Sequence, residues 1–225
     1  MTAPWDGPTL VVDASTYEGT VAVLRDGVVA ATGSARMRGE HEERLLPAVL
    51  ATMAEAGYAL REVARVVCGA GPGSFTSLRI AGAIAKGAAM GAGTPLFAVP
   101  SLALIAAGGE VPLAPGRWLA MLDAMRDERY AALFDVRADG SVHEGERVGI
   151  IAAADVPSVC ERLQARPVGP LEDTVGWPHA RGAARLLDAI GGVGPVPLDG
   201  WEPDYGRLAE AQVKWEAAHG RVLEA

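Results

Sequence analysis

The pattern of apolar and polar positions predicts three strands within the first part of the chain. An apolar run from Thr9 to Asp13 ends in an acid, and the β-rich run Thr20 to Leu24 follows it. The pair Asp26-Gly27 is a strong two-residue signal for a hairpin turn, so we expect Val28 to Ser34 to return as the partner strand. The chain therefore opens as a three-stranded start of an open sheet.

A single apolar stripe then predicts an amphipathic helix. Its members recur at helical spacing, with most charged residues off the stripe: Leu45, Leu46, Val49, Leu50 and Met53. Pro47 is tolerated only in the first turn of a helix, so we expect the regular helix to begin close to it. Gly57 is expected to end the helix.

Strands and helices alternate in the segment that follows. The expected elements, in order, are a strand over 63–68, a helix over about 75–90, a strand over 96–99 and a helix over 101–107. A glycine-rich turn, Gly69 to Gly73, joins the first two, and Ser74 and Ser101 are the expected caps of the two helices. This alternation is typical of an α/β fold.

The second half of the chain repeats the opening of the first. Strands are expected over 117–122, 130–136 and 141–151, and helices over 155–164, 177–190 and 210–219. Asp13 and Asp123 occupy equivalent places, which indicates an internal repeat of about 110 residues. The Gly- and Pro-containing stretch Gly108 to Gly116 reads as a linker. We therefore expect an N-terminal α/β subdomain over 1–108 and a C-terminal one over 109–225.

Composition and charge exclude several classes of protein. The 225 residues carry a net charge of −8, and no stretch is rich in Lys and Arg, which argues against a protein that grips nucleic acid alone. No span of about 20 apolar residues is present, and the first eight residues do not resemble a secretory signal, so we expect a cytoplasmic protein. Cys68 and Cys160 are the two cysteines and lie far apart in the sequence, so we expect neither a zinc site nor a disulfide framework.

Three segments contain residues that can carry chemistry. They supply the candidate residues of a nucleotide or anion cleft: Asp13, Ser15, Gly71, Gly73, Ser74 and Asp123. Backbone N–H groups of a glycine-rich turn at a helix start can bind an anion, and an acid at a strand end can hold a cation. The alternative reading of each segment is structural: an Asx turn, a tight strand-to-helix turn and a solvated hairpin. The glycine turn is not a Walker A loop, because no Gly-Lys-Ser/Thr ends it.

Taken together, these segments resemble the TsaB (YeaZ) family of tRNA threonylcarbamoyladenosine biosynthesis proteins. The residues that carry the resemblance are Val11 to Thr16, His41 to Pro47, Gly71 to Ile80, Ala85 to Gly87, Val99 to Leu102, Asp123 to Tyr130 and Pro203 to Arg207. The resemblance implies the acetate-kinase/Hsp70/actin-like fold, with two similar α/β halves of which the second is reduced. It also implies a non-catalytic partner of the paralogous transferase TsaD, which modifies the adenosine beside the tRNA anticodon, with the ATPase TsaE as a third member.

The resemblance further implies a partner interface on the two helices expected over 41–57 and 75–90. Its candidate residues are His41, Leu45, Leu46, Val49, Leu50, Met53, Phe75, Arg79, Ala83 and Lys86. Packing on the chain's own sheet is the alternative role for the apolar members. A homodimer is possible when the chain is alone, and tRNA is expected to be contacted mainly through the partners.

The resemblance also bears on cofactors. The catalytic paralogue carries a metal-binding His-x-x-x-His at the start of the helix after the strand that ends here at Val99. This sequence has Ser101 and Ile105 at the two positions, and neither can ligate a metal, so no cofactor is expected. The alternative function is a kinase-like or peptidase-like enzyme of the same fold, which would use Asp13, Gly71 to Ser74 and Asp123. Departures from the family pattern include Ser77 and Gly206.

Overall fold

The computed structural model describes residues 5–38 and 43–206. His41 and the helix expected over 210–219 lie outside these residues. The first sheet has five strands in the order β3-β2-β1-β4-β5. Their bounds are β1 Pro8–Asp13, β2 Glu18–Arg25, β3 Val28–Arg36, β4 Arg65–Gly69 and β5 Leu96–Val99. Strands β1, β4 and β5 are parallel, whereas β2 and β3 are antiparallel to their neighbours, as the hairpin at Asp26-Gly27 requires.

The second sheet repeats this plan with four strands. Their bounds are β6 Gly116–Asp123, β7 Glu128–Val136, β8 Val142–Ala152 and β9 Arg166–Val168. The order β8-β7-β6-β9 matches β3-β2-β1-β4 of the first sheet, including the parallel pairing of β6 with β9. This match confirms the internal repeat and the reduced second half.

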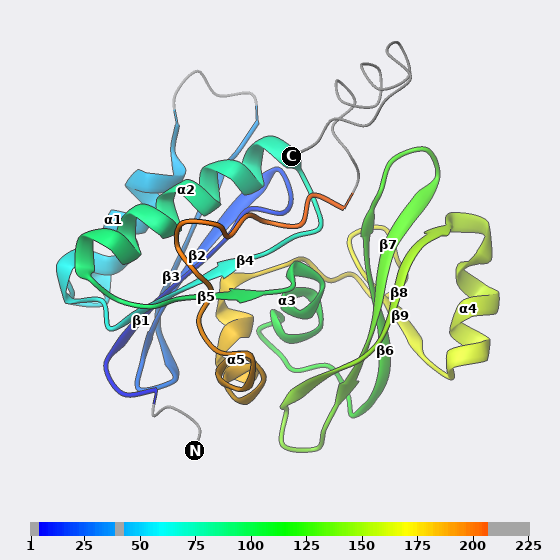
Figure 1. Ribbon diagram of the computed structural model, residues 1–225. Coiled ribbons are helices and arrows are strands. Elements are labelled where there is room, and N and C mark those ends of the chain that lie inside the picture. Colours follow the sequence, from blue (N-terminus) through cyan, green and yellow to red (C-terminus); the bar gives the residue numbers. More distant parts are fainter. Residues whose placement is uncertain (1–4, 39–42, 207–225) are drawn as a thin grey trace, which may run out of the picture.

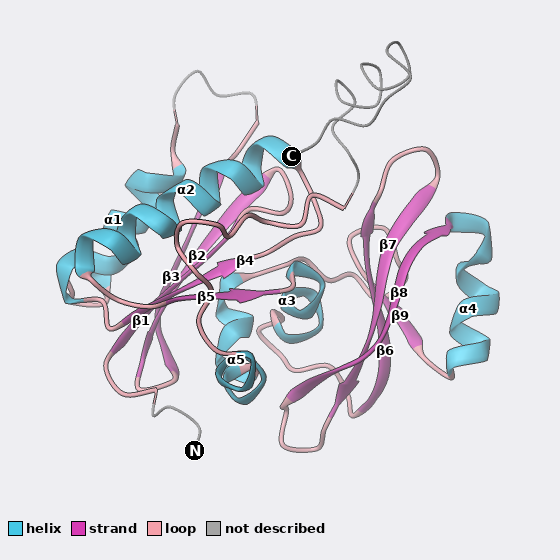
Figure 2. Cartoon of the chain, viewed as in Figure 1, coloured by secondary structure: helices cyan, strands magenta, loops and turns pink. Residues whose placement is uncertain are grey.

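The helices form layers on both sheets (Figures 1 and 2). Their bounds are α1 Leu45–Glu55, α2 Phe75–Ala92, α3 Ser101–Ala107, α4 Val156–Leu163 and α5 Leu187–Val193, with short 3-10 helices at Leu60–Glu62, Ala153–Asp155 and Ala180–Arg185. Helices α1 and α2 cover one face of the first sheet. Helix α3 and the 3-10 helix η3, Ala180–Arg185, share a core with its other face and with the second sheet, whose outer face carries α4.

Strand alternation assigns side chains to these layers. Leu10 and Val12 of β1 pack with α1 and α2, whereas Val11 packs into the core between the two sheets. Successive residues of a strand point to opposite faces, so a continuous apolar run indicates a strand that is covered on both sides. The run Thr9 to Asp13 is buried throughout, which places the end of β1 at the centre of the molecule.

The start expected for the helix near Pro47 is confirmed, whereas the helix expected over 177–190 differs in the structure. Helix α1 begins at Leu45, so Pro47 lies in its first turn, where its missing N–H removes no helical hydrogen bond. The single helix expected over 177–190 is instead η3 followed by α5, with a break at Leu186 (φ −119°). Tertiary contacts override the helical pattern here. A Cβ built on Gly182 would lie 3.0 Å from the Gly108 nitrogen, and the Ala180 amide donates to Thr20 Oγ1 at 3.0 Å.

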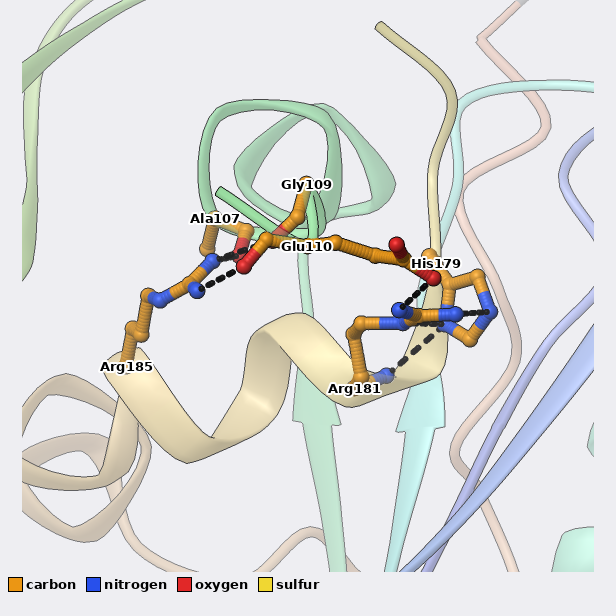
Figure 3. Close-up of polar contacts among 6 residues, drawn as sticks. All are labelled: Ala107, Gly109, Glu110, His179, Arg181 and Arg185. Atoms are coloured by element: carbon orange, nitrogen blue, oxygen red, sulfur yellow. Dashed lines mark hydrogen bonds and ion pairs between the residues drawn. The ribbon is translucent and has the colours of Figure 1, made fainter. Parts of the chain in front are cut away.

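Two arginines of η3 fasten it to the end of α3 (Figure 3). Arg185 Nη1 donates to the carbonyl oxygens of Ala107 and Gly109, the latter at 2.7 Å. Arg181 Nη1 donates to Glu110 Oε1 at 2.9 Å. The last carbonyls of a helix lack partners within the helix, so Arg185 supplies a donor to the carbonyl oxygen of the buried Ala107.

We expect His179, which precedes η3, to make stability depend on pH. Burial, and then the neighbouring Arg181, lower the pKa of His179 from 6.5 to about 4, while Glu18 and Glu110 act in the opposite sense. The unfolded chain therefore binds this proton at a higher pH than the folded chain, so stability is full above about pH 6.5 and falls as the pH drops toward 4. Allowing for partial solvent exposure, we expect a loss of about 1–2 kcal/mol.

The measurement for His179 is urea unfolding between pH 7 and pH 4, compared with His179→Asn. Carboxylates contribute equally to both proteins, so the difference between the two pH profiles isolates the histidine. The variant should show the shallower decline. Superimposable profiles would contradict a role for His179.

After α5 the chain returns to the first sheet. Val196 forms an isolated antiparallel bridge with Leu96, and Trp201 packs beside α2. The linker expected over 108–116 separates the two sheets, yet η3 from the later part of the chain contacts β1, β2 and β3, and Trp201 packs beside α2. The subdomain bounds 1–108 and 109–225 therefore stay a prediction. Within the described part of the chain, no helix is long and apolar enough to cross a membrane.

Candidate functional site

The apolar stripe of α1 divides into two faces in the structure. Leu45, Val49 and Met53 are buried against the first sheet. Leu46 and Leu50, in contrast, are 40% and 49% exposed. Their spacing of four residues places them together on the solvent side of the helix. The first three residues therefore hold α1 on its sheet, and only the last two are available to a partner.

Helix α2 shows the same division. Its alanines at 81 and 85 are fully buried, whereas Ala83, Arg79 and Phe75 are exposed, the last to 38%. The Arg79 guanidinium lies over the Phe75 ring at 5.2 Å, and Lys86 Nζ lies 5.9 Å from the Trp201 ring centroid. Candidate interface residues of α2 thus reach the surface, and some of them already contact the returning chain.

Helices α1 and α2 are neighbours on the same face of the first sheet (Figure 1). Their exposed large apolar side chains are Leu46, Leu50, Phe75 and Met90. We name the exposed surface of these two helices the α1/α2 face. A Cβ built on Gly87 would meet nothing within 4 Å, so the face is also open to close approach by another backbone.

The candidate cleft residues around Asp13 form a closed hydrogen-bond network. Asp13 is fully buried at the end of β1. Its Oδ1 accepts from the Ser15 amide at 3.1 Å and from Ser15 Oγ at 2.8 Å, and its Oδ2 accepts from Ser101 Oγ at 2.6 Å. Burial raises the pKa of this carboxyl, and the hydrogen bonds from Ser101 and Ser15 oppose the shift. Both oxygens are engaged inside the protein.

Ser101 joins this network instead of capping α3. The capping position belongs to Pro100, and Ser101 is the first residue of the helix. Its Oγ accepts from the Gly71 amide at 3.0 Å while donating to Asp13. The cap expected at Ser101 is therefore wrong, because the buried carboxylate competes for the hydroxyl. The ends of β1, β4 and β5 are tied together as a result.

The glycine turn approaches β1 too closely for side chains. A Cβ on Gly73 would lie 2.1 Å from the Ser15 carbonyl oxygen. The Ser74 amide donates to that same oxygen at 2.8 Å. Ser74 does occupy the capping position of α2, but its Oγ pairs with Ser77 Oγ at 3.0 Å and makes no capping bond. The Ser74 amide that an anion would need is thus engaged by the protein itself.

Asp123 has different surroundings from Asp13. It is half exposed, accepts from the Met125 amide at 2.9 Å, and lies 3.9 Å from Arg129 Nη1. Arg129 also bonds Glu172 Oε1 at 3.2 Å, which ties the β6–β7 turn to the segment after β9. The turn contains three successive non-glycine residues with positive φ, Met125 to Asp127. The two equivalent aspartates therefore have distinct roles.

A cavity of about 400 Å³ lies between the two sheets. Of the six candidate cleft residues, only Gly71 lines it. Its polar side chains come from residues outside the expected set: Tyr130, Glu144, Arg147 and Asp204. Tyr130 and Asp204 belong to segments that carry the family resemblance, and this resemblance is the sequence signal that could have identified them. Glu144 and Arg147 lie on an exposed edge strand and had no signal in the sequence.

Cys68 and Ile105, the second of the two positions that correspond to the paralogue's metal ligands, are both packed inside the protein. Cys68 is fully buried, and this burial, followed by the charge of Asp13, raises the pKa of its thiol. Ile105 is packed in the core between the sheets. Among residues 5–38 and 43–206, no group of three or more His, Cys, Asp and Glu side chains is placed to hold a metal ion.

Two sheets of matching strand order, with helices between them, define a protein of the acetate-kinase/Hsp70/actin-like fold. A family model described as "TsaD: tRNA N6-adenosine threonylcarbamoyltransferase" matches residues 35–161, more than half of the chain. The chain belongs to the TsaB/YeaZ family of tRNA threonylcarbamoyladenosine biosynthesis proteins.

Individual relatives agree with this assignment. The TsaB protein of Escherichia coli is 34% identical over 69% of this chain and 65% of its own length, so that match spans slightly less than two thirds of the relative. The TsaB protein of Bacillus subtilis is 29% identical over 92% of this chain and 96% of its own length. One solved structure is the crystal structure of an uncharacterized protein with similarity to peptidase YEAZ from Pseudomonas aeruginosa. It matches with a TM-score of 0.70 and 28% identity, and the match covers 89% of this chain and 100% of that one.

Proposed function

We propose that this chain is the non-catalytic partner of a TsaD-type threonylcarbamoyltransferase in the formation of N6-threonylcarbamoyladenosine on tRNA. The α1/α2 face would bind the transferase, and the ATPase TsaE would join the pair. The observation that carries the proposal is the division of α1 into a buried face and an exposed apolar face. The family name of the relatives supports the pathway.

The exposed apolar face supports docking of another protein. Single exposed apolar residues are normal, but a group on two adjacent helices marks an interaction surface. Leu46 and Leu50 project from α1, and Phe75 and Met90 project from α2. The family model of the transferase itself covers both helices, so we propose that the paralogue presents equivalent helices and pairs with them. The same geometry would allow a homodimer when the chain is alone.

The state of Asp13 supports a non-catalytic role. A carboxylate that is fully buried and bonded to Ser15 and Ser101 is not open to a substrate. A kinase-like enzyme would need Asp13, Gly71 to Ser74 and Asp123 around one ligand, and this alternative has less support because Asp123 contacts Arg129 instead. With a net charge of −8, the chain would leave most tRNA phosphate contacts to its partners in the cytoplasm.

Depletion of the protein tests the proposed pathway. We expect the threonylcarbamoyladenosine content of total tRNA, measured by mass spectrometry of its nucleosides, to fall as the protein is depleted. Re-expression of the wild-type chain should restore it. Unchanged threonylcarbamoyladenosine after complete depletion would overturn the proposal. Titration of the protein with ATP and Mg²⁺ in a calorimeter tests the enzymatic alternative. That alternative requires a heat of ATP binding in the wild type and its loss in Asp123→Ala.

A further inference from the structure

The last described segment, Trp201–Gly206, crosses from one sheet system to the other. We name it the C-terminal strap. Its first part lies on α2: Pro203 is buried, and a Cβ built on Gly82 would touch its ring at 3.4 Å. Trp201 lies beside Lys86 at 5.9 Å. The strap is therefore seated along the helix that contributes half of the α1/α2 face.

The middle of the strap contacts the glycine turn and the start of α2. The Asp204 amide donates to the Ala70 carbonyl oxygen at 2.7 Å. The Tyr205 ring packs on the Phe75 ring with centroids 4.5 Å apart. A Cβ on Gly71 would lie 2.1 Å from the Asp204 carbonyl oxygen, so this approach is possible only beside glycine. Phe75 is thus both an exposed residue of the α1/α2 face and the seat of Tyr205.

The end of the strap contacts the second sheet. Arg147 Nη2, on β8, donates to Asp204 Oδ2 at 2.8 Å, and Asp204 Oδ1 accepts from the Gly206 amide at 2.8 Å. Gly206 has φ +76°, and a Cβ there would lie 2.5 Å from the Tyr130 ring. A side chain at this position would push the strap away from β7. The departure from the family pattern at Gly206 therefore has a structural reason in this chain.

The strap also forms part of the wall of the cavity between the sheets. Asp204 and Gly206 line the cavity together with Gly71, Tyr130 and Arg147. The bond that ties the strap to β8 is exposed, since the Arg147 and Asp204 side chains are 77% and 49% accessible. An exposed ion pair contributes little to stability, so this end can release without unfolding of either sheet.

We infer that the C-terminal strap is a latch that couples the α1/α2 face to the cavity between the two sheets. A protein that binds over Phe75 has to include or displace Tyr205, and displacement of Tyr205 pulls Asp204 and Gly206 from the cavity wall. Conversely, release of Asp204 from Arg147 frees the Phe75 ring. The coupling is a property of this chain alone, so it can be tested without any partner.

Fluorine NMR tests the latch, because the chain contains only three phenylalanines. Phe97 and Phe134 are 6% and 0% exposed, and they serve as internal references beside Phe75. In protein labelled with 4-fluorophenylalanine, Gly206→Ala and Arg147→Ala should move the Phe75 signal toward that of the free amino acid. The two reference signals should not move. Phe75→Leu identifies the signal by its loss.

Hydrogen exchange of the Asp204 amide gives the second readout. We expect it to exchange about fivefold faster in Arg147→Ala, the factor that corresponds to an exposed ion pair. Arg117→Ala removes a surface arginine that pairs with Asp135 at 3.9 Å, and it should change neither readout. An unmoved Phe75 signal in Gly206→Ala and Arg147→Ala would overturn the coupling, whatever the Asp204 amide does. An unmoved Phe75 signal would not change the result of the depletion experiment, so the latch and the proposed function can be refuted independently.

Discussion

Leu46→Glu should weaken binding to the proposed TsaD-type partner by at least about 100-fold, equivalent to about 2.7 kcal/mol. Leu46 is 40% exposed on the α1/α2 face, and a carboxylate there would lose its water in the complex without gaining a partner. The fold should tolerate the change, because Leu46 lies in the first turn of α1, where the helix dipole favours an acid. Titration of the purified partner, by calorimetry or surface plasmon resonance, measures the loss.

Val193→Glu is the matched control for this substitution. Val193 is 80% exposed at the end of α5, away from the α1/α2 face, and the change adds the same charge. Its affinity for the partner should equal that of the wild type. Leu50→Glu should reproduce the defect one turn further along α1. Equal affinities for Leu46→Glu, Leu50→Glu and the wild type would remove α1 from the interface.

Asp13→Ala should lower the free energy of unfolding by about 3 kcal/mol. The substitution removes the acceptor of three hydrogen bonds and leaves the O–H donors of Ser15 and Ser101 without their acceptor at the point where β1, β4 and β5 end. Urea unfolding followed by circular dichroism measures the change. The equivalent substitution in the second half, Asp123→Ala, should cost less than about 1 kcal/mol, because Asp123 is half exposed.

Asp13→Asn separates the hydrogen bonds from the charge. Burial raises the pKa of Asp13, so the folded protein holds this proton more tightly than the unfolded chain, and the ionised carboxylate is destabilising above the folded pKa. The amide keeps an acceptor for Ser15 without a buried charge, and we expect it to recover most of the stability lost in Asp13→Ala at pH 7. Equal losses for the Ala variants at positions 13 and 123 would refute the distinction between the two aspartates.

The sequence predicted most elements of the fold because their signals are local. Strand runs such as Thr9 to Asp13, the turn at Asp26-Gly27 and the helix after Gly73 depend on neighbouring residues, and the structure confirms each of them. The segment 177–190 was predicted as one helix and is two, because Arg185 and Gly182 make contacts with the end of α3, about 75 residues earlier in the chain. No local pattern contains such a contact.

The candidate site was predictable only in part. Periodicity identified α1 as amphipathic but could not divide its stripe, since Leu46 and Leu50 lie within the same apolar arc as Leu45 and Val49. The position of the sheet beneath the helix decides which of them are covered. Similarly, Arg147 carries no sequence signal, and only the fold brings it to the cavity wall and within hydrogen-bond distance of Asp204.

The sequence by itself determined the repeated α/β plan and the family, since both depend on residue types in fixed local order. Tertiary structure alone decided the roles of two residues that look equivalent in the sequence. Asp13 is buried and structural, because β1 is covered on both faces and ends beneath the glycine turn. Asp123 ends a strand of the reduced sheet and stays open to water. Burial depends on which elements pack over a residue, and packing is a property of the whole fold.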